Sequence, residues 1–257
     1  MNALGSSRPG YVGLQTLNRG EQVAAEAAPP HRDLDELSLV LNSLGHDLRE
    51  PLRTIACYSE LLKRPGLKDC EREEYLYFIT TASKRMQALV DGLLSYGQVF
   101  VSQQSRPFNW VDMNVAAQTA IANLQMKIEE ARALVVLDPL PKVWGDSVQL
   151  CQLMQNLIAN AIQYRGEEPP QILLRALPRE QDWIFFVEDN GIGIPREWQE
   201  SIFQPLKRLR PTNSSGSGLG LAICRHIVER HGGRIWVEAS SEKGTVFAFT
   251  LPHNEAR

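Results

Sequence analysis

The sequence has 257 residues, of which 43% are hydrophobic and 22% charged, and its formal net charge is −3. This composition is typical of a globular protein with one or two domains, and it gives no broad positive field for binding nucleic acid or an anionic membrane. No apolar run approaches the roughly 20 residues that cross a bilayer. We therefore expect no nucleic-acid partner, no membrane insertion and a cytoplasmic location.

The N-terminal part divides into a tail and a helix. Residues 1–32 are rich in Gly, Ala, Ser and Pro without a sustained period, which predicts a flexible N-terminal tail. From Leu37 onward, apolar residues alternate in steps of three and four, and this spacing predicts a helix that ends at Pro65-Gly66. The members of this apolar seam are Leu37, Leu41, Leu44, Leu48, Pro51, Ile55, Tyr58 and Leu62.

A second seam with the same spacing follows the acidic segment 69–74. Its members are Tyr75, Ile79, Ala82, Met86, Leu89, Leu93 and Tyr96. The short connection predicts an antiparallel helical hairpin over residues 33–104. Further apolar residues such as Phe78, Val90 and Leu94 widen the stripe beyond what one helix covers, so we expect a homodimer that forms a four-helix bundle. Periodicity alone leaves open a monomeric hairpin that docks on the rest of the chain.

The pattern changes after Gln103, which predicts a linker over residues 105–111, a second domain over 112–252 and a C-terminal tail over 253–257. Strands and helices are mixed in this domain, so we expect an α+β protein whose second domain is a two-layer α/β sandwich. The expected strands are Ala133–Leu137, Lys142–Trp144, Ile172–Leu177, Trp183–Glu188, Arg234–Glu238 and Val246–Leu251. The expected helices are about Val115–Glu130, Ser147–Tyr164 and Leu219–His231.

Three amide side chains share one face of the middle helix of this domain. Asn156, Asn160 and Gln163 recur at positions i, i+4 and i+7. Amide oxygens are hard ligands that suit Mg²⁺, so the stripe could hold a magnesium–phosphate unit. Taken alone, solvated amides on a helix surface are the commoner interpretation.

Two glycine-containing segments also indicate a binding site. Asp189 ends a strand and precedes Gly191 and Gly193, where a carboxylate could accept a hydrogen bond from an exocyclic amine while the glycines admit a flat ring. The run 216–221 leads into a helix whose free N–H groups could cradle phosphates. It lacks the Lys of a P-loop, and no βαβ unit supports a dinucleotide fold. The Asp189 segment alone is equally compatible with an ordinary turn, and a lone glycine run of this kind is weak evidence.

Taken in order, four segments resemble the H, N, G1 and G2 boxes of sensor histidine kinases, and the first is most similar to phytochrome-type kinases. They are His46-Asp47-Leu48-Arg49-Glu50-Pro51-Leu52, Asn156–Asn160, Asp189–Gly193 and Gly216–Gly220. The resemblance covers about residues 34–252. It implies a dimeric phosphotransfer hairpin followed by an ATP-binding sandwich of the gyrase and heat-shock-chaperone type. The implied activity is ATP-dependent phosphorylation of His46, with transfer to an aspartate on the receiver domain of a response regulator.

The resemblance also implies residue roles. Asp47 would be the general base for His46, Asn160 the Mg²⁺ ligand, Asn156 a phosphate-facing amide and Asp189 the partner of the adenine amine. Tyr164 and Ile194 would line the base pocket, and a lid would span about residues 195–215. The remaining expected ATP-binding residues are Gln163, Gly191, Gly193, Gly216, Ser217, Gly218, Leu219, Gly220, Leu221 and Thr245.

The first helix places its histidine away from the apolar seam. With Leu44 and Leu48 in the seam, His46 is expected on the outer face, within reach of a docking domain. Pro51 deletes the backbone hydrogen bond to Asp47 and so loosens the helix beside the histidine.

Three positions depart from the family pattern. Gln163 stands where lysine is usual, which removes one positive phosphate contact that Arg165 or a lid arginine could replace. Leu206 replaces the second phenylalanine of the F box. Glu50 stands where kinases with phosphatase activity carry Thr or Asn, so we expect weak or absent phosphatase activity. A nucleotide-binding pseudokinase scaffold is the alternative function, and we expect the input to come from a separate sensor protein or from a longer chain.

Overall fold

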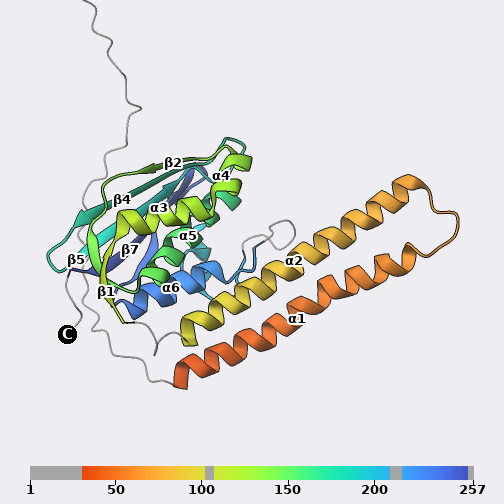
Figure 1. The fold of residues 1–257 in the computed structure, drawn as a ribbon, viewed down its shortest axis with the longest axis horizontal. Helices are drawn as coiled ribbons and strands as arrows, with labels where there is room; N and C mark the ends of the chain where they lie inside the picture. The colour runs from red at the N-terminus through yellow and green to blue at the C-terminus, as the bar shows by residue number, and fades with distance from the viewer. Residues whose placement is uncertain (1–30, 102–106, 209–215, 254–257) are drawn as a thin grey trace, which may run out of the picture.

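The computed structural model describes residues 31–101, 107–208 and 216–253. Two long antiparallel helices, α1 (His31–Leu61) and α2 (Asp69–Val101), form a hairpin that we call the stalk. The rest of the chain folds into an α/β sandwich, and α2 lies between α1 and this sandwich (Figure 1). The predicted fold class, a helical hairpin followed by a two-layer sandwich, is confirmed.

The two helices of the stalk pack through the predicted seams. Leu44 and Leu89 are fully buried. Phe78, which was expected outside the seam, also packs within the hairpin, because its ring stacks on that of Tyr58 with 4.6 Å between centroids. Leu41, which was expected in the seam, is 48% exposed because no part of this single chain covers it. Several other apolar side chains of the stalk are also exposed, namely Leu52, Leu76, Tyr77, Val90 and Leu94. Among the described residues, no helix is long and apolar enough to span a bilayer.

The sandwich is built on a five-stranded sheet in the order β2-β4-β5-β7-β6. Its strands are β2 (Leu134–Leu137), β4 (Gln171–Pro178), β5 (Asp182–Asp189), β6 (Ile235–Ser241) and β7 (Gly244–Pro252). Only the β2–β4 pair is parallel within this sheet of described strands. The helices α3 (Met113–Asn123), α5 (Ser147–Gln163) and α6 (Gly220–Arg230) cover one face (Figure 1). The buried sides of helices and sheet form one continuous core.

Two sequence predictions for the start of the sandwich were wrong. The helix predicted over Val115–Glu130 is interrupted at Leu124, where φ is −101° and ψ is 7°, and a second helix α4 (Gln125–Ala131) follows. Leu124 itself is buried, so packing of its side chain outweighs the propensity to continue the helix. The predicted linker 105–111 contains the start of strand β1 (Asn109–Asp112), which pairs with β3 (Lys142–Gly145). This partner is distant in sequence and could not be read from local pattern.

Parts of three further predictions lie outside the described residues. These are most of the tail 1–32, residues 209–215 of the expected lid and residues 254–257 of the C-terminal tail. Where the chain is described, α1 already begins at His31, within the segment predicted as tail. The other strands and helices lie within a few residues of their predicted bounds, and β6 and β7 extend further toward their common turn.

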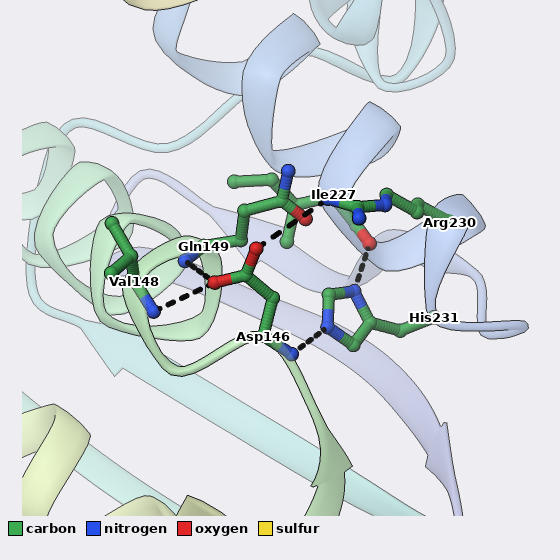
Figure 2. A network of polar contacts seen from close by, with 6 residues as sticks. All are labelled: Asp146, Val148, Gln149, Ile227, Arg230 and His231. Atoms are coloured by element: carbon green, nitrogen blue, oxygen red, sulfur yellow. Dashed lines mark hydrogen bonds and ion pairs between the residues drawn. The ribbon is translucent and has the colours of Figure 1, made fainter. Parts of the chain in front are cut away.

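A buried polar network joins the start of α5 to the end of α6 (Figure 2). Asp146 caps α5, because its Oδ1 accepts hydrogen bonds from the N–H groups of Val148 and Gln149 at 3.0 and 3.3 Å. The Asp146 N–H donates to Nε2 of His231 at 3.0 Å, and Nδ1 of His231 lies 2.7 Å from the Ile227 carbonyl oxygen. This arrangement requires one neutral tautomer of His231, with its proton on Nδ1.

The neutral state of His231 predicts a loss of stability in acid. Burial, followed by the charge of Arg230, lowers the pKa of His231 from its ordinary 6.5, although the bond to Ile227 and the charge of Asp146 oppose the shift. As pH falls below 6.5, the unfolded chain takes up a proton that the folded chain excludes, so stability is lost down to the lowered folded pKa. We expect His231→Gln to be less stable at neutral pH but to lose less stability with each unit of acidification. Urea unfolding of both proteins between about pH 5 and 7 measures the two slopes, which differ by at most about 1.4 kcal/mol per pH unit. Equal slopes would contradict the prediction.

Candidate functional site

The amide stripe of α5 lines a cavity of ≈ 390 Å³. The opposite side of the helix, including Leu153 and Leu157, is buried in the core and fixes which face turns outward. Asn156 donates from Nδ2 to the Gly220 carbonyl oxygen at 3.4 Å, which ties the stripe to the start of α6. The Asn160 side chain makes no hydrogen bond with any described residue. The hydrogen bond of Asn156 uses its amide nitrogen, so both asparagines keep an amide oxygen for a ligand, and Asn160 is the one whose whole side chain is uncommitted among the described residues.

A carboxylate held at the end of β5 forms another wall of the cavity. Asp189 Oδ1 accepts hydrogen bonds from the N–H groups of Gly191 at 2.8 Å and Thr245 at 3.2 Å. Burial raises the pKa of Asp189, and the two backbone hydrogen bonds act in the opposite direction. The other oxygen, Oδ2, accepts no hydrogen bond from the described part of the chain. Asp189 therefore presents a mostly buried acceptor to whatever occupies the cavity.

The turn after Asp189 packs backbone against backbone on the β6–β7 hairpin. Gly193 has φ of +72°, and a Cβ atom there would lie 1.9 Å from the Ser241 carbonyl oxygen. The neighbouring Ile194 N–H donates to Ser240 Oγ at 2.7 Å. This packing brings Gly193, Ile194 and Thr245 to the cavity, as their assignment to one site requires.

The glycine run before α6 forms a further wall of the cavity, next to α5. A Cβ atom on Gly216 would lie 2.8 Å from Nε2 of Gln163, so the Gln163 side chain reaches this loop. The guanidinium of Arg208 donates to the Gly216 carbonyl oxygen. Leu206, despite replacing the expected phenylalanine, docks on the loop through its N–H, which donates to the Gly218 carbonyl oxygen at 2.9 Å. The loop is thus held from both α5 and the segment after β5.

The structure brings together most of the predicted ligand-binding residues. Two do not line the cavity: Gly191 is buried and donates to Asp189, and Leu219 is fully buried in the core. The others all line it: Asn156, Asn160, Gln163, Tyr164, Asp189, Gly193, Ile194, Gly216, Ser217, Gly218, Gly220, Leu221 and Thr245. Gly191 and Leu219 thus lie behind the cavity lining, and their contact with a nucleotide stays a prediction.

Residues of the stalk line the same cavity and were missed by sequence reasoning. They are Ala88, Asp91, Gly92 and Ser95 of α2. A Cβ atom on Gly92 would lie 2.4 Å from Ser217 Oγ, so α2 passes very close to the glycine loop. No local motif marks these positions, because only the docking of stalk on sandwich brings them to the site.

Positive charge is present in the cavity although Gln163 supplies none. The cationic side chains that line it within the described residues are Lys127 of α4, Lys207 and Arg208. Arg165, which was one candidate to replace the missing lysine, does not line it; its backbone forms an isolated bridge with Gly191. Lys127 reaches the site because the interruption at Leu124 starts a new helix beside α5, and sequence reasoning missed it for that reason.

His46 lies on α1, outside the cavity lining, with 86% of its side chain exposed. Its Nδ1 is 3.9 Å from Asp47 Oδ1. Arg208, which lines the cavity, is close enough to Asp47 for that charge to raise the pKa of the guanidinium, although burial is the larger effect and lowers it. The exposure expected for His46 is confirmed, and its neighbour Asp47 lies near one wall of the cavity.

Two family models match the chain. The one described as His Kinase A (phospho-acceptor) domain matches residues 36–99, within the stalk. The one described as Histidine kinase-, DNA gyrase B-, and HSP90-like ATPase matches residues 145–255, which hold the whole amide stripe and both glycine segments.

Curated relatives extend the likeness over nearly the whole chain. Cyanobacterial phytochrome A of Nostoc sp. (strain PCC 7120) is 40% identical over 92% of this chain and 31% of its own length. Adaptive-response sensory kinase SasA of Synechococcus sp. (strain CC9902) is 36% identical over 83% of this chain and 56% of its own length. The chain thus spans from about a third to little more than half of these relatives.

Solved structures match both parts of the fold. A crystal structure of histidine kinase ThkA in complex with response regulator protein TrrA matches with a TM-score of 0.67 and 25% identity, covering 88% of this chain and 65% of that one. The catalytic domain of ThkA alone matches with a TM-score of 0.50 and 30% identity, covering 58% of this chain and 97% of that one.

Proposed function

Because the chain belongs to the sensor histidine kinases, we propose that it binds ATP with Mg²⁺, phosphorylates its own His46 and passes the phosphoryl group to an aspartate of a response regulator. The observation that carries this proposal is the placement of the cavity. A carboxylate, an amide stripe and a glycine loop surround it, and α2 of the stalk that bears His46 forms one of its walls. An ATP-binding protein histidine kinase needs these parts next to one another.

We assign the adenine base to the end of the cavity at Asp189. Its free oxygen would accept a hydrogen bond from the exocyclic amine, and Tyr164 and Ile194 would flank the ring. Gly193 would hold Ile194 at this end of the cavity through its close packing on the Ser241 carbonyl. The phosphates would then extend toward the N–H groups at the start of α6, next to Gly218 and Gly220.

The donor set of α5 fits Mg²⁺. Asn160 offers an amide oxygen that no described residue uses, and such hard oxygen ligands, completed by phosphate oxygens and water, are the usual environment of this ion. Bound there, Mg²⁺ would neutralise charge that develops on the phosphates during transfer. Asn156 would hold the start of α6 against the stripe through Gly220.

The acceptor reaction follows from the pairing of His46 with Asp47. Asp47 lies on the Nδ1 side of the ring, so a proton on Nδ1 leaves the lone pair of Nε2 free to attack the γ-phosphorus in line. The N–P bond forms as the bond between the γ-phosphorus and the bridging oxygen breaks, and ADP leaves. Asp47 would stabilise the positive ring and then take the Nδ1 proton.

Incubation with ATP radiolabelled on the γ-phosphate tests the proposal. We expect acid-labile, alkali-stable label on the wild type and at least about a 100-fold loss in His46→Gln, since no other group replaces the nucleophile. His253→Gln, at the far end of the sandwich, is the matched control and should label normally. Equal labelling of His46→Gln and wild type would overturn the proposed acceptor.

The alternative is a nucleotide-binding pseudokinase scaffold, which Gln163 in place of a lysine favours. Three other cationic residues line the same cavity and can supply the positive charge that Gln163 lacks: Lys127, Lys207 and Arg208. Binding of a fluorescent ATP analogue by a wild type that never acquires acid-labile label would support the scaffold instead.

The partners are proposed from the exposed surface and the relatives. The uncovered apolar residues of the stalk support pairing with a second copy as a four-helix bundle. The complex of ThkA with TrrA supports a response regulator as the phosphoryl acceptor. We place the reaction in the cytoplasm, where ATP is available, and assign the input to a separate sensor protein or to a longer chain.

A further inference from the structure

A salt bridge crosses the stalk one helical turn from the acceptor histidine. Arg85 of α2 holds Glu50 of α1, with 2.9 Å between Nη2 and Oε2. Glu50 follows His46 by four residues, so the two side chains project from the same face of α1. The guanidinium of Arg85 is therefore placed beside the surface on which the phosphoryl group would stand.

Arg85 is only partly committed to this salt bridge. Its Nε is buried and has no hydrogen-bond partner among the described residues, and 32% of its side chain is exposed. Glu50 is 66% exposed and can turn into water, so the pair between them is weak. The guanidinium of Arg85 therefore has an unused N–H donor and only a weak ion pair with Glu50. It can leave Glu50 for an anion that carries more charge.

The surroundings of His46 contain two carboxylates and two guanidiniums. The pKa of Arg208 is lowered by burial and by the charge of Arg85, and the charges of Asp47 and Glu50 raise it, so all four groups lie within electrostatic reach. Their charges cancel when all are ionised. A phosphoryl group adds about −1.5 to −2 charge and three strong acceptor oxygens, which leaves the cluster short of positive charge.

We propose that Arg85 exchanges partners during the reaction: it binds Glu50 while His46 is unmodified, and it binds the phosphoryl oxygens once His46 is phosphorylated. Arg85 then stabilises the phosphohistidine by direct contact with the phosphoryl group, and Glu50 competes for Arg85. A planar guanidinium can donate two parallel hydrogen bonds to a phosphoryl group, which makes it a better partner for that group than for an exposed carboxylate. This inference rests on the proposed phosphorylation of His46.

The equilibrium between ATP plus free histidine and ADP plus phosphohistidine tests the exchange. At a fixed ratio of ATP to ADP, we expect Arg85→Gln to lower the phosphorylated-to-unphosphorylated ratio by about 10-fold, the effect of one charge-assisted hydrogen bond. Glu50→Gln should raise that ratio, because it frees Arg85 for the phosphoryl group. Arg85→Lys should restore part of the ratio, since the charge remains but the two-pronged geometry is lost.

Exchange predicts that Arg85→Gln and Glu50→Gln shift the phosphorylated-to-unphosphorylated ratio in opposite directions, which a purely structural salt bridge does not. If the pair only fastens α1 to α2, both Gln variants remove the same contact and shift the ratio in the same direction, which would overturn the exchange. Lys63→Gln, which removes the exposed Lys63–Glu60 pair near the stalk turn, is the matched control and should leave the ratio unchanged. Thermal unfolding of each variant verifies that it folds. A wild type without acid-labile label would instead refute the proposed function.

Discussion

Asp189→Asn is expected to weaken ATP binding by about 30- to 100-fold while the sandwich stays folded. The carboxylate uses Oδ1 for the N–H groups of Gly191 and Thr245, and an asparagine oxygen can keep those bonds. Its amide nitrogen then takes the place of Oδ2 and presents a donor to the donating amine of adenine. Loss of a hydrogen bond to a charged group, together with a buried donor left unpaired, costs about 2–3 kcal/mol.

Titration with a fluorescent ATP analogue measures this loss. Asp182→Asn is the matched control, because Asp182 begins the same strand that Asp189 ends and does not line the cavity. GTP, whose ring carries an oxygen where adenine has its amine, should recover affinity relative to ATP in Asp189→Asn. Unchanged ATP affinity in that variant would show that the base binds elsewhere.

Gly193→Ala is expected to destabilise the sandwich by about 3 kcal/mol or more and to abolish measurable ATP binding. The residue has φ of +72°, which alone costs an alanine about 1–2 kcal/mol. Its Cβ would also lie 1.9 Å from the Ser241 carbonyl oxygen and 2.7 Å from the carbonyl carbon, so backbone must move on one side. The movement would separate the turn after Asp189 from the β6–β7 hairpin and displace Ile194.

Urea unfolding and nucleotide titration check the two parts of this prediction. Gly97→Ala is the control, because a Cβ atom on this helical glycine meets nothing within 4 Å. That variant should be neutral or stabilised by about 0.5–1 kcal/mol, the usual gain from alanine in a helix interior. A Gly193→Ala protein as stable as Gly97→Ala would show that the hairpin adjusts freely.

Local sequence could predict the residues whose placement depends only on the helix or strand that contains them. The spacing of Asn156, Asn160 and Gln163 needs only the helical period, and Asp189 needs only its place at the end of a strand. His46 is exposed, as its position outside the seam predicts, because packing of one helix against another decides which face is free. Each of these predictions used only the repeat or the boundary of one helix or strand, without knowledge of contacts between distant segments.

The residues that were missed depend on contacts between distant segments. Lys127 reaches the cavity through a helix interruption that the buried side chain of Leu124 decides, and Asp91 and Ser95 reach it through docking of the stalk. Leu219 shows a related limit of motifs: it belongs to the glycine run, but its side chain packs into the core, a placement that the run itself does not predict. The Glu50–Arg85 pair joins residues 35 positions apart and leaves no local trace.

At Gly92, which has no side chain, the backbone of α2 lies directly against the glycine loop that precedes α6. A methyl group at this position would come within 2.4 Å of the Ser217 hydroxyl, so no side chain fits between α2 and the loop here. Closely packed surfaces tend to step between discrete arrangements instead of deforming smoothly. When α2 moves along or about its axis, the glycine loop must move with it or separate from it, so a shift of α2 against α1, the helix that carries His46, would also change the shape of the cavity.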